Sequence, residues 1–295
     1  MPHWSAGNMP KKAKITATLR RSDKWRAVLT DTSPFEVPVI FSTDGMYKNL
    51  SDIDGKSTHI KAFINAIMLH DKHKHNYKIP YRYRIVKSGV SFRQLSLLHP
   101  ASQTNISEFY LKNQSLICYY ANRGSFSLRY PEKVGSTYFF DSPIAERNKY
   151  KNDAVDTSEI DKLTRNPASY FAYRSFDRLY KFFISTQYIE LEKRFSIMTS
   201  LDVSKCFDSI YTHSIAWAVK EKFFVKDNLN AVMFGSSFDE LMQRMNLNET
   251  NGICIGPETS RIFAEIILSR IDKDVEDELR RCPLELIQFR VGSGP

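Results

Sequence analysis

Asp202 is the residue of this chain whose surroundings most directly predict chemistry. It follows the apolar run Phe195–Leu201, whose pattern predicts a strand buried on at least one face. A carboxylate without a partner would cost several kcal/mol in such a place, so we expect a metal ion or a basic side chain beside it. The other interpretation is an ordinary aspartate that caps the turn after a strand.

A second group of residues that could take part in chemistry occupies the stretch 251–261. Gly252 and Gly256 have no side chains, so a ligand could approach the backbone closely at both positions. Ser260 and Arg261 follow Pro257, which is well suited to the first residue of a helix. The spacing therefore predicts a tight loop that runs directly into a long helix.

The stretches 198–210 and 251–261, taken in this order, resemble two consecutive palm motifs of reverse transcriptases. The resemblance implies an RNA-directed DNA polymerase, a nucleotidyltransferase in which Asp202 is catalytic. Asp202 and the backbone carbonyl of Val203 would bind Mg²⁺, because two divalent ions stabilise charge on the entering and leaving oxygens. Oxygen ligands of this kind suit magnesium.

Two further residues acquire roles only through this resemblance. Phe207 would lie beneath the sugar and exclude a 2′ hydroxyl by its bulk, which selects deoxynucleotides. Gly256 would contact the incoming nucleotide. The alternative for Phe207 is a buried aromatic residue that stabilises its turn, in which case shortening it lowers stability and leaves sugar choice unchanged.

A narrower resemblance comes from two departures from the usual pattern. Cys254 and Ile255 stand where reverse transcriptases usually carry proline and glutamine. Together with the stretch 209–217, this looks like the bacterial abortive-infection and defence-associated reverse transcriptases, some of which extend DNA without a conventional template. The resemblance implies a role in antiviral defence.

The family normally carries an aromatic-X-Asp-Asp hairpin after the second motif. The run Leu284–Arg290 looks like the strand that leads into this hairpin, but no Asp-Asp dipeptide occurs in the sequence. The resemblance therefore implies a polymerase truncated before that motif, without a thumb domain and inactive alone. The missing aspartates would come from a longer version of the protein or from another chain.

Ahead of these motifs, the runs Tyr81–Lys87 and Phe92–Leu98 alternate in character around a turn at Gly89. This pattern predicts a β-hairpin with one polar face. The resemblance implies that Lys87 and Arg93 hold the triphosphate and that Arg84 contacts nucleic acid. The alternative is a solvated strand face.

Between residues 105 and 150, aromatic and basic residues alternate in a way that suits stacking on single-stranded bases. Arg123, Arg129 and, in the second motif, Arg261 are the candidate nucleic-acid contacts. Aromatic residues are more often part of a core than a platform for bases, so packing is the competing interpretation.

Periodicity predicts the elements that would position these residues. A short buried strand is expected at Val39–Phe41. Helices are expected at residues 60–69, 169–195, 215–219, from Ser237 to Met245, and from Pro257 to Leu279.

The order of these elements is the one expected of a palm, and the resemblance implies an α+β fold built as a right-hand polymerase, with fingers and a partial palm that contains a ferredoxin-like sheet. We expect an N-terminal region at 1–79, fingers at 80–189 and a partial palm at 190–295. The formal net charge of +9 favours polyanionic partners. RNA or DNA and deoxynucleoside triphosphates are the expected partners, and a second polymerase chain or a second copy of this chain is a further candidate.

The cysteines and the apolar runs favour a cytoplasmic protein. The four cysteines are widely spaced and form no CxxC pair, which argues against a zinc ribbon or a disulfide framework. No apolar run reaches the roughly eighteen residues that a membrane span needs. No membrane partner is therefore expected.

Two other classes of function compete with a polymerase. The first is a non-catalytic nucleic-acid-binding or assembly subunit of a defence complex. The second is a nucleotide-binding regulator on a ferredoxin-like sheet, which the positive net charge disfavours.

Overall fold

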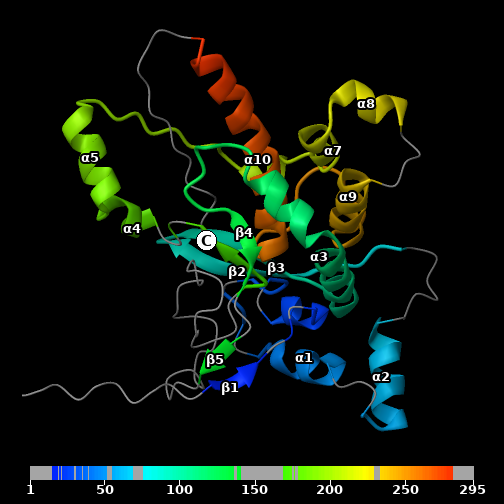
Figure 1. The fold of residues 1–295 in the computed structure, drawn as a ribbon. Coiled ribbons are helices and arrows are strands. Elements are labelled where there is room, and N and C mark those ends of the chain that lie inside the picture. Colours follow the sequence, from blue (N-terminus) through cyan, green and yellow to red (C-terminus); the bar gives the residue numbers. More distant parts are fainter. Residues whose placement is uncertain are drawn as a thin grey trace, which may run out of the picture.

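The computed structural model is a mixture of helices and short strands (Figure 1). It describes residues 15–18, 20, 22–29, 31–34, 36–38, 40–51, 55–68, 76–135, 138–140, 169–174, 176, 179–228 and 233–281. The strands in these ranges form three two-stranded sheets. The chain therefore belongs to the mixed helix and strand class that we expected.

The N-terminal region consists mainly of short helices. A 3₁₀-helix, η1 (Lys24–Val28), packs on the long helix α3 (Pro100–Ala121), and α1 (Asp44–Ser51) and α2 (Thr58–Met68) follow η1. Helix α2 confirms the prediction for residues 60–69.

The strand predicted at Val39–Phe41 is wrong over its described residues. Ile40 is exposed and lies in a turn. A strand needs a hydrogen-bonded neighbour, and none of the described strands lies beside this segment.

The predicted hairpin is confirmed. Strands β2 (Tyr81–Ser88) and β3 (Ser91–Leu97) are antiparallel, with Tyr81 opposite Leu97 and Val86 opposite Phe92. Gly89 adopts a φ of +48° in the turn, a conformation that glycine reaches without steric cost.

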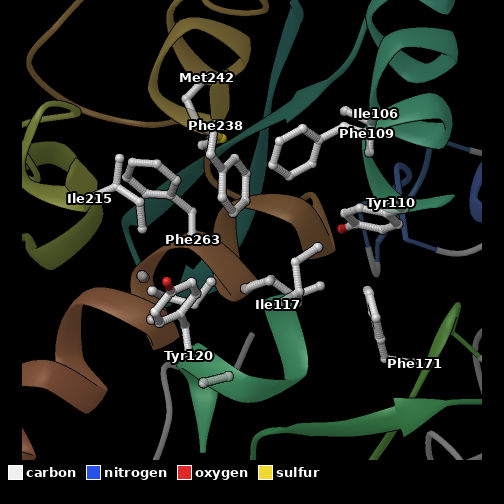
Figure 2. Packing of buried hydrophobic residues seen from close by; sticks show 14 of the residues in the cluster. Ile106, Phe109, Tyr110, Ile117, Tyr120, Phe171, Ile215, Phe238, Met242 and Phe263 are labelled. Atoms are coloured by element: carbon white, nitrogen blue, oxygen red, sulfur yellow. The ribbon is translucent and has the colours of Figure 1, made fainter. Parts of the chain in front are cut away.

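The core lies where α3 meets α9 (Phe234–Arg244) and α10 (Glu258–Leu279). The ring of Phe238 is 4.7 Å from that of Phe109 and 5.0 Å from that of Phe263, measured between centroids. Figure 2 shows these side chains from α3, α9 and α10 pointing toward one another. Such aromatic side chains bury large areas and so dominate the stability of this core.

The same core joins the three regions that we expected from the sequence. Ala27, Phe109 and Phe263, which come from residues 1–79, 80–189 and 190–295 respectively, all belong to one cluster of buried residues. Tyr110 adds a polar link between α3 and α10, because its hydroxyl donates a hydrogen bond to Oγ1 of Thr259 at 3.0 Å.

The remaining strands form two small sheets, and Phe171 and Tyr173 of one of them belong to the core. Strand β1 (Ile15–Thr18) pairs with β5 (Tyr138–Phe140), and β4 (Pro131–Val134) pairs with β6 (Phe171–Tyr173). The helix predicted over 169–195 is therefore wrong at its start, because the aromatic residues of β6 satisfy their backbone groups by pairing with β4.

The rest of that prediction is confirmed by α4 (Leu179–Phe183) and α5 (Thr186–Arg194). The side chain of Ser185 caps α5, since its Oγ accepts a hydrogen bond from the backbone N–H of Tyr188 at 3.2 Å.

The strand expected at Phe195–Leu201 is not formed. This segment is irregular, and Ile197 and Leu201 are exposed. An apolar pattern forms a strand only where a second strand pairs with it, and none of the described strands pairs with this segment. The described ranges therefore contain no ferredoxin-like sheet.

Short helices follow this segment: α6 (Cys206–Ser209), α7 (Ser214–Val219) and α8 (Lys222–Asp227). Helix α7 confirms the prediction for residues 215–219. Helix α9 begins at Phe234, three residues before the predicted Ser237, because the Oγ of Ser236 accepts a hydrogen bond from the N–H of Met233 at 2.9 Å. Helix α10 confirms the long helix predicted to Leu279, but it begins at Glu258, one residue later than predicted, because Pro257 is extended and precedes the helix as its N-cap.

No helix within the described ranges is both long and apolar enough to cross a membrane. The cytoplasmic location stays a prediction.

Candidate functional site

The two motif stretches, although far apart in sequence, lie side by side. The backbone N–H of Ile253 donates to the carbonyl of Phe207 at 2.9 Å, and the N–H of Gly252 donates to the carbonyl of Ile210 at 2.9 Å. Tyr211 and Asn251 form an antiparallel bridge next to these bonds. The backbone of one motif is therefore fixed against the backbone of the other.

Gly252 makes this close approach possible. Its φ is +86°, and a Cβ added at this position would lie 3.1 Å from the carbonyl oxygen of Asp208. Any larger residue would be strained in its backbone and crowded against α6. The glycine predicted for ligand approach thus serves contact between the two motifs.

The β2–β3 hairpin is attached to the same loop. The N–H of Ser96 donates to the carbonyl of Ile255 at 2.9 Å, and the guanidinium of Arg82 donates to Oδ1 of Asn246 at 3.1 Å. Gly256, with a φ of +118°, lies where a Cβ would be 2.7 Å from the side chain of Pro34. The hairpin, the 250–257 loop and the segment 207–212 therefore form one connected unit.

The three basic residues predicted on the hairpin do not share one face. Arg84 lies opposite Gln94, and Arg93 lies opposite Ile85, so strand alternation places the two arginines on opposite faces. Lys87 lies where the register shifts between Val86 and Ser88. None of the three forms an ion pair with a carboxylate within the described part of the chain, so their charges remain available to an anion.

Asp202 lies in the irregular segment rather than at the end of a strand. Its side chain and that of Val203 are exposed. Within the described ranges, no cluster of three acidic, histidine or cysteine side chains could hold a metal ion. One carboxylate and one backbone carbonyl are too few ligands for Mg²⁺, so the described residues do not by themselves fit the expected ion.

Phe207 is half-buried at the start of α6 and packs against the core. The residue before α6, Lys205, adopts a φ of 52°, which turns the chain sharply into the helix. The carbonyl of Phe207 faces the 250–257 loop, where it receives the hydrogen bond from Ile253. The residue expected beneath a sugar therefore lies at the junction of the two motifs.

Arg129 and Arg261, two of the expected nucleic-acid contacts, converge on one buried carboxylate. Oε1 of Glu258 is 3.3 Å from Nη2 of Arg129, and Oε2 is 3.3 Å from Nη1 of Arg261. The guanidinium of Arg129 also lies 4.1 Å from the centre of the Tyr173 ring. Burial opposes ionisation of Glu258, but the charges of Arg261 and Arg129 hold its pKa below the ordinary value.

Arg123, the third expected contact, binds the end of a helix. Its Nη1 donates to the carbonyl of Ala218 at 2.7 Å, and its Nη2 donates to the carbonyl of Val219 at 3.0 Å. These are carbonyls of the last turn of α7, where a cation is favourable. Internal contacts thus account for Arg123, Arg129 and Arg261, and their role in binding nucleic acid stays a prediction.

Sequence reasoning missed the residues that join these parts. Ser96, Asn246 and Pro34 carry no motif, and their contacts with Ile255, Arg82 and Gly256 arise only when distant segments meet. Glu258 is a similar case, because its position at the start of α10 predicts a favourable charge at a helix N-terminus and says nothing of Arg129.

A scan against models of known protein families finds no match for this chain. A search of curated proteins finds no sequence that is significantly similar. The function must therefore be argued from the residues and their geometry.

Proposed function

We propose that this chain is the nucleotide-binding and nucleic-acid-binding part of an RNA-directed DNA polymerase of the reverse-transcriptase type. One observation carries the proposal. The two stretches that resemble consecutive polymerase motifs are joined by backbone hydrogen bonds, and the basic hairpin is joined to the same loop. These three parts meet in a polymerase because a nucleotide must touch all of them at once.

In this proposal the hairpin binds the triphosphate. Lys87 and Arg93 supply positive charge that no described carboxylate neutralises, and charge-assisted hydrogen bonds to phosphate are stronger than neutral ones. We assign Arg84, which lies on the opposite strand face from Arg93, to the backbone of a template or primer. Phe207 limits the space next to the sugar.

Asp202 is the acidic residue of this proposal. Because it lies in an irregular, exposed segment, its carboxylate is accessible but is not held toward the hairpin by any described partner. Divalent ions would supply charge stabilisation in a polymerase of this type, and the described residues give them only one carboxylate. Further acidic ligands from outside the described ranges are therefore a requirement of the catalytic proposal.

The binding step can be tested on the chain itself with a fluorescent analogue of deoxythymidine triphosphate. We expect Arg93→Ala and Lys87→Ala each to weaken binding about tenfold or more, since a hydrogen bond to a charged group contributes about 1.5–3 kcal/mol. Lys112→Ala is the matched control, because Lys112 is an exposed lysine on α3 away from the hairpin. Equal binding by all four proteins would refute the assignment of the hairpin.

The catalytic step needs a separate measurement. Incorporation of labelled deoxynucleotides on an RNA template would be compared, in the presence of Mg²⁺, between wild type and Asp202→Asn in a longer version of the protein that supplies the missing Asp-Asp motif. Incorporation that Asp202→Asn abolishes would support the polymerase. Undiminished incorporation by this variant would exclude Asp202 as the catalytic carboxylate.

A second candidate function is non-catalytic binding of nucleic acid, as an assembly subunit of a defence complex. Among the described residues Asp202 belongs to no group of three potential metal ligands, and a protein that only binds nucleic acid needs none. Salt-sensitive RNA binding that survives Asp202→Ala, together with no incorporation by wild type, would support this alternative. The role in antiviral defence is proposed on the motif resemblance alone in either case.

A further inference from the structure

Helices α7 and α8, with Tyr211 just before α7, carry a group of exposed aromatic and basic side chains that the proposed function does not use; Tyr211 contributes only its backbone to the junction of the two motifs. The exposed fractions of the aromatic side chains range from 36% for Trp217 to 78% for Phe223. Figure 1 places α7 and α8 apart from the β2–β3 hairpin. We call this group the α7–α8 surface, and its residues are Tyr211, Trp217, Lys220, Lys222, Phe223 and Phe224.

The ring of Tyr211 is held in place by a buried carboxylate that acts through His213. Asp239 is buried, and its Oδ1 accepts a hydrogen bond from Nε2 of Gln243 at 2.6 Å. Its Oδ2 binds Nδ1 of His213, whose ring meets Tyr211 edge to face with 4.8 Å between centroids. A buried carboxylate, satisfied on both oxygens, therefore fixes an exposed tyrosine.

Tyr211 and Trp217 form a pair at the centre of the surface. Their ring centroids are 6.0 Å apart and the planes are inclined at 48°. Both rings are partly exposed, so each can stack on a planar ligand. Rings that are already ordered lose little conformational freedom when they bind.

Lysines accompany the exposed rings. Nζ of Lys222 lies 5.0 Å from the centre of the Trp217 ring, and Nζ of Lys220 lies 5.6 Å from that of Phe224. These ammonium groups stay at the surface, where they can also meet a phosphate.

The acidic residues of this region do not cancel the charge. Glu221 lies 3.4 Å from the guanidinium of Arg270, which also pairs with Asp274 at 3.0 Å. Lys220, Lys222 and Lys226 outnumber Glu221 and Asp227 by one over residues 220–227. The surface is therefore weakly basic.

We propose that the α7–α8 surface binds single-stranded nucleic acid. Bases would stack on Trp217, Tyr211 and Phe223, and the lysines would bind the phosphates between them. A protein partner would have to desolvate the lysines, whereas a polyanion pairs with them. A duplex would hide the faces of its bases, so the strand must be single. The proposal does not depend on polymerase activity.

The experiment measures binding of a short fluorescein-labelled oligothymidylate to the full chain by anisotropy. We expect Trp217→Leu to raise Kd about tenfold, as stacking of one base contributes on this scale. Phe223→Leu, at a side chain that is 78% exposed, should raise Kd several-fold without loss of folding. The matched control is Phe63→Leu on α2, an aromatic side chain that is 66% exposed, and it should leave Kd unchanged.

The same measurement separates this surface from the hairpin. In an Arg93→Ala background, Trp217→Leu should still raise Kd by the same factor, because the two sites lie apart. Binding of a duplex of the same sequence should not respond to Trp217→Leu. The proposal is overturned if Trp217→Leu and Phe223→Leu both change Kd by less than twofold, or if Phe63→Leu changes it as much.

Discussion

Replacement of Glu258 by glutamine gives the sharpest test of the ion pairs that Glu258 forms with Arg129 and Arg261. The carboxylate lies 3.3 Å from one nitrogen of Arg129 and 3.3 Å from one nitrogen of Arg261. The exposed fractions of these side chains are 11%, 10% and 17% for Glu258, Arg129 and Arg261, so water screens the pairs only weakly. Glu258→Gln removes the negative charge that Arg129 and Arg261, both largely shielded from water, share.

The size of the expected loss in the free energy of unfolding follows from this burial. Removal of one partner of a buried ion pair costs about 3–5 kcal/mol, and glutamine keeps part of the hydrogen bonding, so we expect a loss of about 3 kcal/mol in the free energy of unfolding at pH 7. In a protein of this size, each kcal/mol lowers Tm by about 2–4 °C. Thermal melting followed by circular dichroism should therefore show a Tm lowered by about 6–12 °C.

The pH dependence gives an independent check. Burial opposes the charge of Glu258, but Arg261 and Arg129 hold its pKa below the ordinary value of 4.5 in the folded state. A carboxylate with a lowered pKa contributes stability that is fully present above the unfolded value and is lost as pH falls through the folded value. The gap between wild type and Glu258→Gln should thus be constant near neutrality and shrink below about pH 4.5.

The control lies on the same helix. Glu278 pairs with Arg281 at 2.9 Å, but both side chains are 73% exposed, so Glu278→Gln should change stability by less than about 1 kcal/mol. The reasoning is refuted if Glu258→Gln and Glu278→Gln destabilise the protein equally. It is also refuted if the effect of Glu258→Gln is unchanged at acidic pH.

Two further substitutions test the junction of the motifs. Gly252→Ala should lower the free energy of unfolding by about 1–3 kcal/mol in urea titrations, because φ is +86° and the new Cβ would crowd Asp208. Gly45→Ala, in α1 with open space around it, is the control and should not destabilise. Phe207→Val should reduce the ratio of the affinities for dCTP and CTP about tenfold if the Phe207 ring limits the sugar site. An unchanged preference, with a lower free energy of unfolding, would assign Phe207 to packing alone.

The sequence pattern predicted correctly those elements that are formed by neighbouring residues or that are bounded by a glycine or a proline. The hairpin followed from alternation around Gly89, and α10 followed from Pro257 and a regular apolar face. The strand expected at Phe195–Leu201 failed because a strand is a property of two segments. Ile197, Met198 and Leu201 are exposed, and the described ranges contain no partner strand for the segment.

The same limit applied to the candidate site. Charge and spacing identified Lys87 and Arg93, which do lie on a hairpin joined to the second motif. They could not show that Arg129 and Arg261 bind Glu258, since an arginine on a protein surface and one in a buried ion pair have the same sequence signature. Only the meeting of distant segments distinguishes the two.

In the proposed function, nucleotide binding and catalysis depend on different parts of the chain. The hairpin, the 250–257 loop and Phe207 are held together by backbone hydrogen bonds that do not involve Asp202, so the proposed binding surface does not need this residue. Asp202 belongs to an exposed segment that has no regular structure, and none of the described strands pairs with residues 195–201. Asp202→Asn should therefore leave the affinity for a deoxynucleoside triphosphate within about twofold of wild type while it removes any incorporation. A large loss of affinity in this variant would mean that Asp202 already faces the hairpin.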